Sequence, residues 1–163
     1  MATRKTIATA RKTAARPRPV WQRVARPDSI DFRDRRFQPS ISTAPAATLY
    51  PSVGLPVKHQ GETNACTGFG LALVVEHLRL AQQQAESVSP FMLYSMARRY
   101  DEFAGSARDE GSSLRGALKG WFKHGACRAE LFPALEMPPA PERIEDDWWF
   151  DAVTRPLGAY YRV

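Results

Sequence analysis

The stretch QGETNACTGFG, residues 60–70, places Cys66 where a polar, turn-forming loop meets a long apolar segment. The apolar residues continue to about residue 81, and Asn64 is a good N-cap, so we predict a helix that starts near Asn64. This helix is apolar on nearly every face, which is typical of a helix in the core of a fold. Cys66 would then lie in its first turn.

A cysteine in the first turn of a helix can act as a nucleophile. The positive end of the helix dipole, or a histidine beside the thiol, favours the thiolate. The backbone amide of Cys66 and the side-chain amide of Gln60 could donate to the oxyanion that forms in acyl transfer, and Gly61 lets the loop turn tightly. Free cysteines are also among the most often buried residues. The residues alone therefore leave two interpretations of Cys66, a nucleophile and a small core residue.

The length and composition indicate one folded domain. The chain has 163 residues, of which 44% are hydrophobic, which is close to the average of globular proteins. No apolar run reaches the roughly 18 residues that a membrane span needs. No apolar stretch near the N-terminus resembles the core of a signal peptide. We therefore predict a cytoplasmic protein without a membrane span.

The positive charge of the chain is concentrated in residues 1–27. This segment carries eight Arg or Lys residues and no acid, whereas the whole chain carries +6, so residues 28–163 sum to −2. We predict a disordered basic tail over 1–27 and a folded domain over 28–163. Two other interpretations of the tail stay open: a tether to nucleic acid, without sequence choice, or to a membrane surface, and an organellar transit peptide.

The cysteines and histidines do not form a metal motif. Cys66 and Cys127 are 61 positions apart, and the three histidines, His59, His77 and His124, make no short cluster with them. Structural metal sites use much shorter ligand spacings. We expect no metal, no cofactor and two free thiols.

Further elements are predicted along the chain. Ser89-Pro90 is a cap followed by proline at the first helical position, which predicts a helix to about Tyr100. A third helix should start near Ser113 and end at Gly125, with Leu114, Ala117, Leu118, Trp121 and Phe122 on one apolar face. The remaining predictions are a half-buried extended segment at 28–33, loops at 38–57 and 101–113, a short helix at 145–150 and the beginning of a strand at 159–163.

Five segments carry motifs that follow one another in a known order. They are PDSIDFR (27–33), LPVKHQ (55–60), QGETNACTGF (60–69), VSPFMLY (88–94), and Gly111-Ser112 through His124-Gly125-Ala126. In this order they resemble the papain-like cysteine peptidases, whose pattern at the central helix is Gln-Gly-x-Cys-Gly-Ser/Ala-Cys-Trp. Five ordered matches over about residues 27–133 are more specific than one motif.

The resemblance implies a fold and a site. The fold is α+β and papain-like, with this chain supplying the helical lobe and its central Cys66-bearing helix, while the β-rich lobe is largely absent. Cys66 is implied to be the nucleophile and Gln60 the oxyanion-hole side chain. Gly111 and Ser112 are implied to pair, main chain to main chain, with an extended peptide or protein substrate.

The chain also departs from the family pattern. Thr63 replaces a cysteine that forms a disulfide in secreted members, which fits a reducing compartment, and Asn64, Thr67 and Ser112 are further differences. These changes look like those of a divergent branch.

The larger departure concerns the general base. The family's catalytic His and Asn lie roughly 130–150 residues beyond the nucleophile, and 97 residues follow Cys66 here. His59, directly before Gln60, is the substitute that the sequence offers, although its counterpart in the family is a variable loop residue.

Three functions follow from these observations. The first is a cysteine endopeptidase whose 163-residue chain has little activity alone, because the base is absent. The second is a non-catalytic peptide-binding module derived from the helical lobe, and the third makes the basic tail the functional part. A missing C-terminal lobe or a partner chain is expected to cover the face that the helical lobe leaves exposed.

Overall fold

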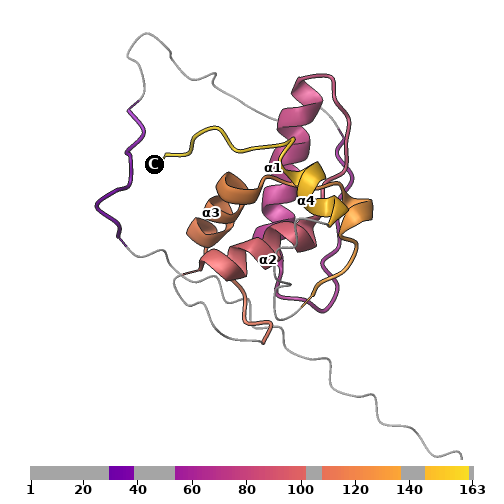
Figure 1. Cartoon of the computed structure of the whole chain (residues 1–163), viewed down its shortest axis with the longest axis horizontal. Helices are drawn as coiled ribbons and strands as arrows, with labels where there is room; N and C mark the ends of the chain where they lie inside the picture. Colours follow the sequence, from indigo (N-terminus) through magenta and orange to yellow (C-terminus); the bar gives the residue numbers. More distant parts are fainter. Residues whose placement is uncertain (1–29, 39–53, 102–107, 137–145, 162–163) are drawn as a thin grey trace, which may run out of the picture.

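The structure, a computed structural model, describes residues 30–38, 54–101, 108–136 and 146–161. Within these residues it is mostly helical and contains no strand, and an isolated antiparallel bridge joins Val88 to Arg128. No helix of the described part combines the length and apolar character that crossing a membrane requires. The helices are α1 (Cys66–Ala81), α2 (Pro90–Tyr100), α3 (Leu114–His124) and α4 (Asp147–Ala152), with a short 3-10 helix at Ala129–Leu131 (Figure 1).

The helix at the centre of the core is α2, which packs against both α1 and α3 (Figure 1). It begins as predicted, because Ser89 is the N-cap, its hydroxyl accepts from the backbone N–H of Met92, and Pro90 is the first helical residue. Eight of its 11 residues are buried, whereas α1 buries five of 16. Helix α1 is therefore not buried on every face, contrary to the prediction, and α2 is the more deeply buried helix.

Glycines let α1 and α3 approach α2 closely. A Cβ atom added to Gly68 would lie 2.2 Å from the carbonyl oxygen of Pro90, and one added to Gly120 would lie 2.8 Å from the Cβ of Met96. Both distances are well below van der Waals contact, so a larger residue would push the helices apart. The backbone of α1 therefore touches α2 two residues after Cys66, which fixes the N-terminal end of α1.

The third helix has the predicted ends and a different buried face. Ser113 is its N-cap and accepts from the backbone N–H of Gly116, and Gly125 ends it at a φ of 77°. Ala117 and Trp121 are buried as expected. Leu114 and Phe122 are exposed instead, because α2 covers only part of the apolar face.

Two predictions of extended structure are wrong for the residues that the structure describes. Ile30 and Phe32 are almost fully exposed, and residues 32–33 turn, because the Asp31 carboxylate accepts from both the backbone and the guanidinium of Arg33. Residues 159–161 form no strand, since a strand needs a partner to pair with. The predicted short helix exists, as α4.

Other predictions fall outside the described residues. These are the basic tail at 1–27, residues 39–53 of the first loop, residues 102–107 of the second, and the ends of two segments, 28–29 and 162–163.

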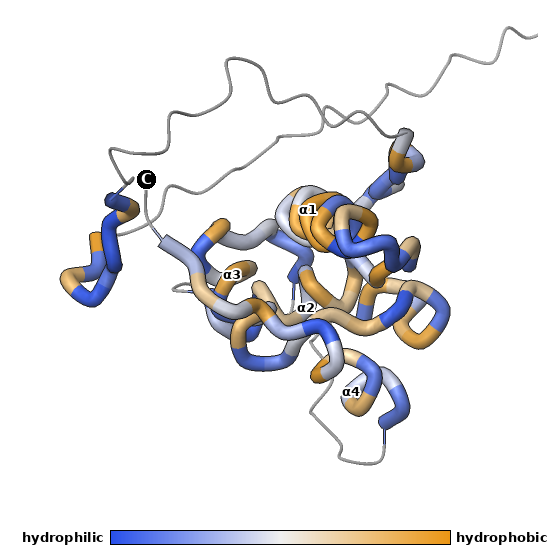
Figure 2. Tube along the Cα trace, turned by 90° about the horizontal axis from the view of Figure 1, so that it is seen from above, coloured by the Kyte–Doolittle hydropathy of each residue, from blue (hydrophilic) through white to orange (hydrophobic). Residues whose placement is uncertain are grey.

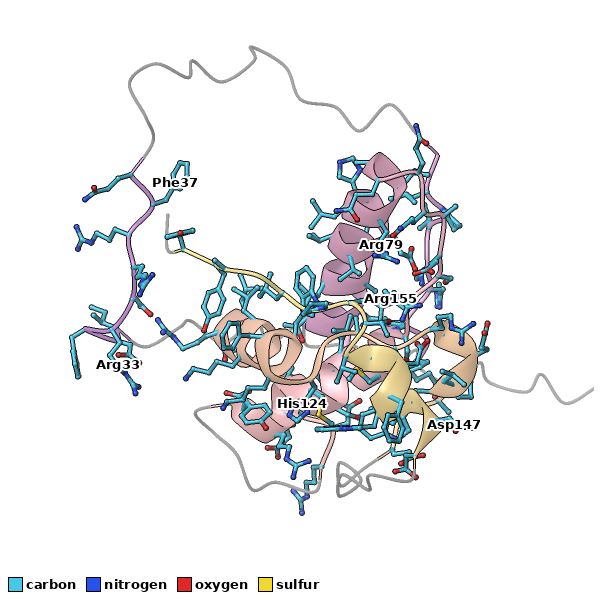
Figure 3. The ribbon with its side chains drawn as sticks, turned by 45° about the horizontal axis from the view of Figure 1, so that its top comes forward. Arg33, Phe37, Arg79, His124, Asp147 and Arg155 are labelled. Carbon is cyan, nitrogen blue, oxygen red and sulfur yellow. The ribbon has the colours of Figure 1, made fainter. Side chains whose placement is uncertain are left out.

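Partly buried ion pairs join α1 to the C-terminal part of the chain. Arg155 is buried, and its guanidinium donates to Glu86 at 2.6 Å and to Asp151 at 2.8 Å. Arg79, in the last turn of α1, donates to the same Glu86 carboxylate at 3.1 Å. Figure 3 labels both arginines, each of which donates to this carboxylate. Hydrogen bonds from Arg155 lower the pKa of Glu86 below its ordinary value.

Candidate active site

Cys66 is the first residue of α1, and its thiol is free and exposed. The predicted helix start is confirmed, but the predicted cap is wrong. The N-cap is Ala65, which has no side chain that can cap. The Nδ2 of Asn64 instead donates to the backbone oxygen of Asp109 at 2.7 Å.

Gln60 lies in a closed turn just ahead of Cys66. Its side-chain Nε2 donates to the backbone oxygen of Thr63 at 2.8 Å, and the Thr63 hydroxyl donates to the backbone oxygen of Gln60 at 2.8 Å. Gly61 has the positive φ of 64° that this turn needs. The turn thus fixes the side chain of Gln60, and the bond to Thr63 uses one of the two hydrogens of its amide.

A buried ion pair anchors the chain that leads into this turn. Lys58 donates to the Glu76 carboxylate at 2.5 Å, to the hydroxyl of Ser87 at 3.0 Å and to the backbone oxygen of Val88 at 3.0 Å. Glu76 is 3% exposed and also accepts from the backbone N–H of Val88 at 2.9 Å. The loop before Cys66 is thus fixed to the middle of α1 and to the entry of α2.

Gly111, in the second predicted loop, forms hydrogen bonds with two side chains of α2. The N–H of Gly111 donates to the phenol oxygen of Tyr94 at 3.0 Å, and its carbonyl accepts from Arg98 at 2.6 Å. Its φ of 82° requires glycine. Both backbone groups that were expected to face a substrate are therefore used within the fold, although a carbonyl oxygen can accept a second bond.

Ser112 brings this loop to the N-terminal end of α1. Its hydroxyl lies 2.5 Å from the hydroxyl of Thr67, the residue after Cys66. Of the two residues expected to bind a substrate backbone, Ser112 thus contacts the residue that follows the cysteine, and it is 2% exposed. The structure brings together the segments of Gln60, Cys66 and Ser112 around one helix end.

The three histidines have different surroundings. The Nδ1 of exposed His59 accepts from the backbone N–H of Gly61 at 3.0 Å, which holds its ring to its own loop. His77 lies 11 residues along α1, about 16 Å along the axis. His124 is buried at the end of α3, where its Nε2 meets the Tyr100 hydroxyl at 2.6 Å and its ring lies 5.0 Å from that of Trp149.

An apolar strip runs down α1 from the cysteine. Leu73, Val74 and Leu78 are 45%, 47% and 48% exposed, and Gly70 and Cys66 are exposed on the same face. Their spacing of three or four residues places them on one side of a helix. Figure 2, in which α1 is seen nearly end-on, shows that hydrophobic residues predominate in this helix. The cysteine therefore stands at one end of an uncovered apolar surface.

Cys127 has the opposite surroundings. It is fully buried and free, and burial raises the pKa of its thiol to about 12. It stays protonated at neutral pH and acts as a small core residue.

Asp109 joins the two loops, and it was not predicted from the sequence. Asp109 accepts from the backbone N–H of Asn64 at 2.7 Å and from the Tyr94 hydroxyl at 2.5 Å. In the sequence it stands in a charged run, Arg108-Asp109-Glu110, which is typical of a solvated loop. Its position two residues before Gly111 was the available signal.

Comparison with known proteins supports the fold. The structure is similar to that of xylellain, a cysteine protease from Xylella fastidiosa, with a TM-score of 0.70 and 24% sequence identity over 85% of this chain and 57% of that chain. No family model matches the sequence, and no curated protein matches it. The chain thus has the fold of part of a cysteine protease, and it spans 57% of that protein's length.

Proposed function

We propose that this chain is the helical lobe of a papain-like cysteine peptidase, with Cys66 as its nucleophile. The observation that carries the proposal is an exposed, free thiol on the first residue of α1, with the segments of Gln60 and Ser112 held around the same helix end. The similarity to a cysteine protease fold is consistent with it.

The proposed reaction is acyl transfer. The sulfur of Cys66 forms a bond to a peptide carbonyl carbon, and the oxygen that becomes negative accepts from the Gln60 amide and the Cys66 backbone N–H. The C–N bond then breaks as the amine leaves with the thiol's proton, and water hydrolyses the thioester. Ser112 is proposed to hold the substrate backbone beside the sulfur, with Gly111 shaping the turn.

The proton transfer needs a base, and the bonds of His59 and His124 and the distance of His77 along α1 argue against these three histidines. We propose that it comes from a further segment or partner chain that packs on the apolar strip of α1. Such a partner would cover Leu73, Val74 and Leu78 and bring its base to the end where Cys66 lies. The 163-residue chain is therefore expected to cleave peptides slowly or not at all.

The proposed location is a reducing compartment. Both cysteines are free, and structural disulfides are rare in the cytosol.

A peptide aldehyde tests the proposal without requiring turnover. The thiol of Cys66 adds to the aldehyde carbon, its proton goes to the oxygen, and the product mimics the tetrahedral intermediate. We expect the wild type and Cys127→Ala to bind a peptide aldehyde more tightly than the matching peptide alcohol, and Cys66→Ala to lose this difference. Gln60→Ala should weaken aldehyde binding about tenfold, since it removes an oxyanion donor.

The controls separate a peptidase site from an exposed thiol. Equal binding of the peptide aldehyde and a simple alkyl aldehyde would contradict the proposal, because the thiol would then have no peptide site beside it. Equal binding of aldehyde and alcohol in wild type and Cys66→Ala would instead indicate a non-catalytic peptide-binding module.

A further inference from the structure

We propose that Asp109 is a positioning residue that fastens the loop before the nucleophile, residues 60–65, to the second loop, residues 108–113. Hydrogen bonds show directly that Asp109 links the two loops. That the two loops flank a substrate rests on the proposed function.

Asp109 reaches three segments of the chain at once. One carboxylate oxygen accepts from the backbone N–H of Asn64 at 2.7 Å, and the other accepts from the hydroxyl of Tyr94 at 2.5 Å. Its backbone oxygen accepts from the side chain of Asn64 at 2.7 Å. Asn64, two residues before Cys66, therefore donates two hydrogen bonds to Asp109.

Tyr94 extends this link to the residue that shapes the second loop. Its side chain is fully buried on α2, and burial raises the pKa of its phenol well above the ordinary value, so it stays protonated. The hydroxyl donates to Asp109 and at the same time accepts from the N–H of Gly111. The rigid core helix α2 is thus the frame to which both loops are fastened.

The loops need such a link because their turns depend on glycine. Gly61 and Gly111 both have positive φ, and glycine gives the backbone wide conformational freedom. The contact between Thr67 and Ser112 joins two hydroxyls, whereas the bonds to Asp109 involve a carboxylate and are the stronger kind. Removing the carboxylate should weaken the link between the two loops, and the bond from Asn64 Nδ2 to the backbone oxygen of residue 109 would remain.

Hydrogen exchange of the backbone amides tests the fastening. In Asp109→Ala, the N–H of Asn64 should exchange about ten- to hundredfold faster, which is the effect of losing one bond to a charged group. The N–H of Gly111 keeps its acceptor, the Tyr94 hydroxyl, but that hydroxyl loses its own partner, so this amide should exchange faster to a smaller extent. Asp109→Asn, with one acceptor oxygen in place of two, should give an intermediate increase. Glu62→Ala is the matched control, because it removes an exposed carboxylate from the same loop and should leave both amides unchanged.

Affinity for the peptide aldehyde tests the positioning. Asp109→Ala should weaken aldehyde binding by about tenfold in parallel with the faster exchange, while Glu62→Ala should bind as the wild type does. Unchanged exchange at Asn64 and Gly111 would overturn the proposal. Faster exchange throughout α2 would also overturn it, because Asp109 would then act on global stability.

The two proposals can fail separately. Faster local exchange with unchanged aldehyde affinity would refute positioning. A wild-type chain that binds no aldehyde would refute the proposed function, and the exchange rates would still decide whether Asp109 fastens the loops.

Discussion

The two faces of α1 are similar in composition and differ in what covers them. On one face Gly68, Leu71 and Val75 pack in the core, and on the other Leu73, Val74 and Leu78 are about half exposed. Apolar residues all around the helix did not lead to burial all around it, because burial depends on what packs against each face. The exposed face begins at Cys66, which is why we propose that a further segment or partner brings the base there.

We expect the largest effect from Glu76, the acidic residue on the buried face of α1. Glu76→Ala would leave the ammonium of Lys58 and the backbone N–H of Val88 without their carboxylate. We expect the free energy of unfolding to fall by about 3–5 kcal/mol, as when one partner of a buried ion pair is removed. Urea unfolding measures this loss.

The neighbouring residue on the exposed face is the control for that experiment. His77→Ala should change the free energy of unfolding by about 0.5 kcal/mol or less, as surface substitutions do. Similar values for the two variants would mean that the two faces do not differ as described.

Two glycines, one on each face, give a smaller effect with opposite signs. An added Cβ at Gly68 meets the backbone of α2, whereas one at Gly70 meets nothing within 4 Å. Gly68→Ala should destabilise the protein by about 1–3 kcal/mol, and Gly70→Ala should stabilise it by about 0.5–1 kcal/mol through helix propensity. Shifts of the melting temperature in the same direction would contradict the comparison.

The smallest effect concerns the ion pairs at the C-terminal end of α1. The folded pKa of Glu86 is lowered, first by its hydrogen bond from Arg155. Its contribution is therefore present above the unfolded pKa of about 4.5 and is lost as the pH falls through the lower folded value. Glu86→Gln should cost about 1 kcal/mol or less near neutral pH, and this cost should shrink as the pH falls below about 4.5 and vanish below the lowered folded pKa.

A titration of stability with urea checks this sign. The curves for wild type and Glu86→Gln should converge as the pH is lowered. A gap that widens in acid would show that the carboxylate is not stabilised by its arginines in the folded state.

The elements that could be predicted are those set by short-range chemistry. Ser89 with Pro90, and Ser113 with Gly125, marked the ends of α2 and α3 correctly, because a cap acts within one turn of its own helix. The position of Cys66 in the first turn of α1 followed from the same kind of signal. The cap assigned to Asn64 is wrong, because the N-cap position falls on Ala65 and the Asn64 side chain donates to a distant residue, Asp109.

Packing decided the features that local patterns could not supply. Leu73 and Leu71 are the same residue type two positions apart, and only the place of α2 makes one exposed and the other buried. Likewise Cys66 and Cys127 are both lone cysteines in the sequence, yet one lies at a helix end and the other inside the core.

The link between the two loops has the same origin. Asn64 and Asp109 are separated by 45 positions, and no pattern of a single sequence pairs them. Chemistry within one turn of the chain determines where helices start and stop, whereas surroundings are determined by contacts between segments that meet only after folding.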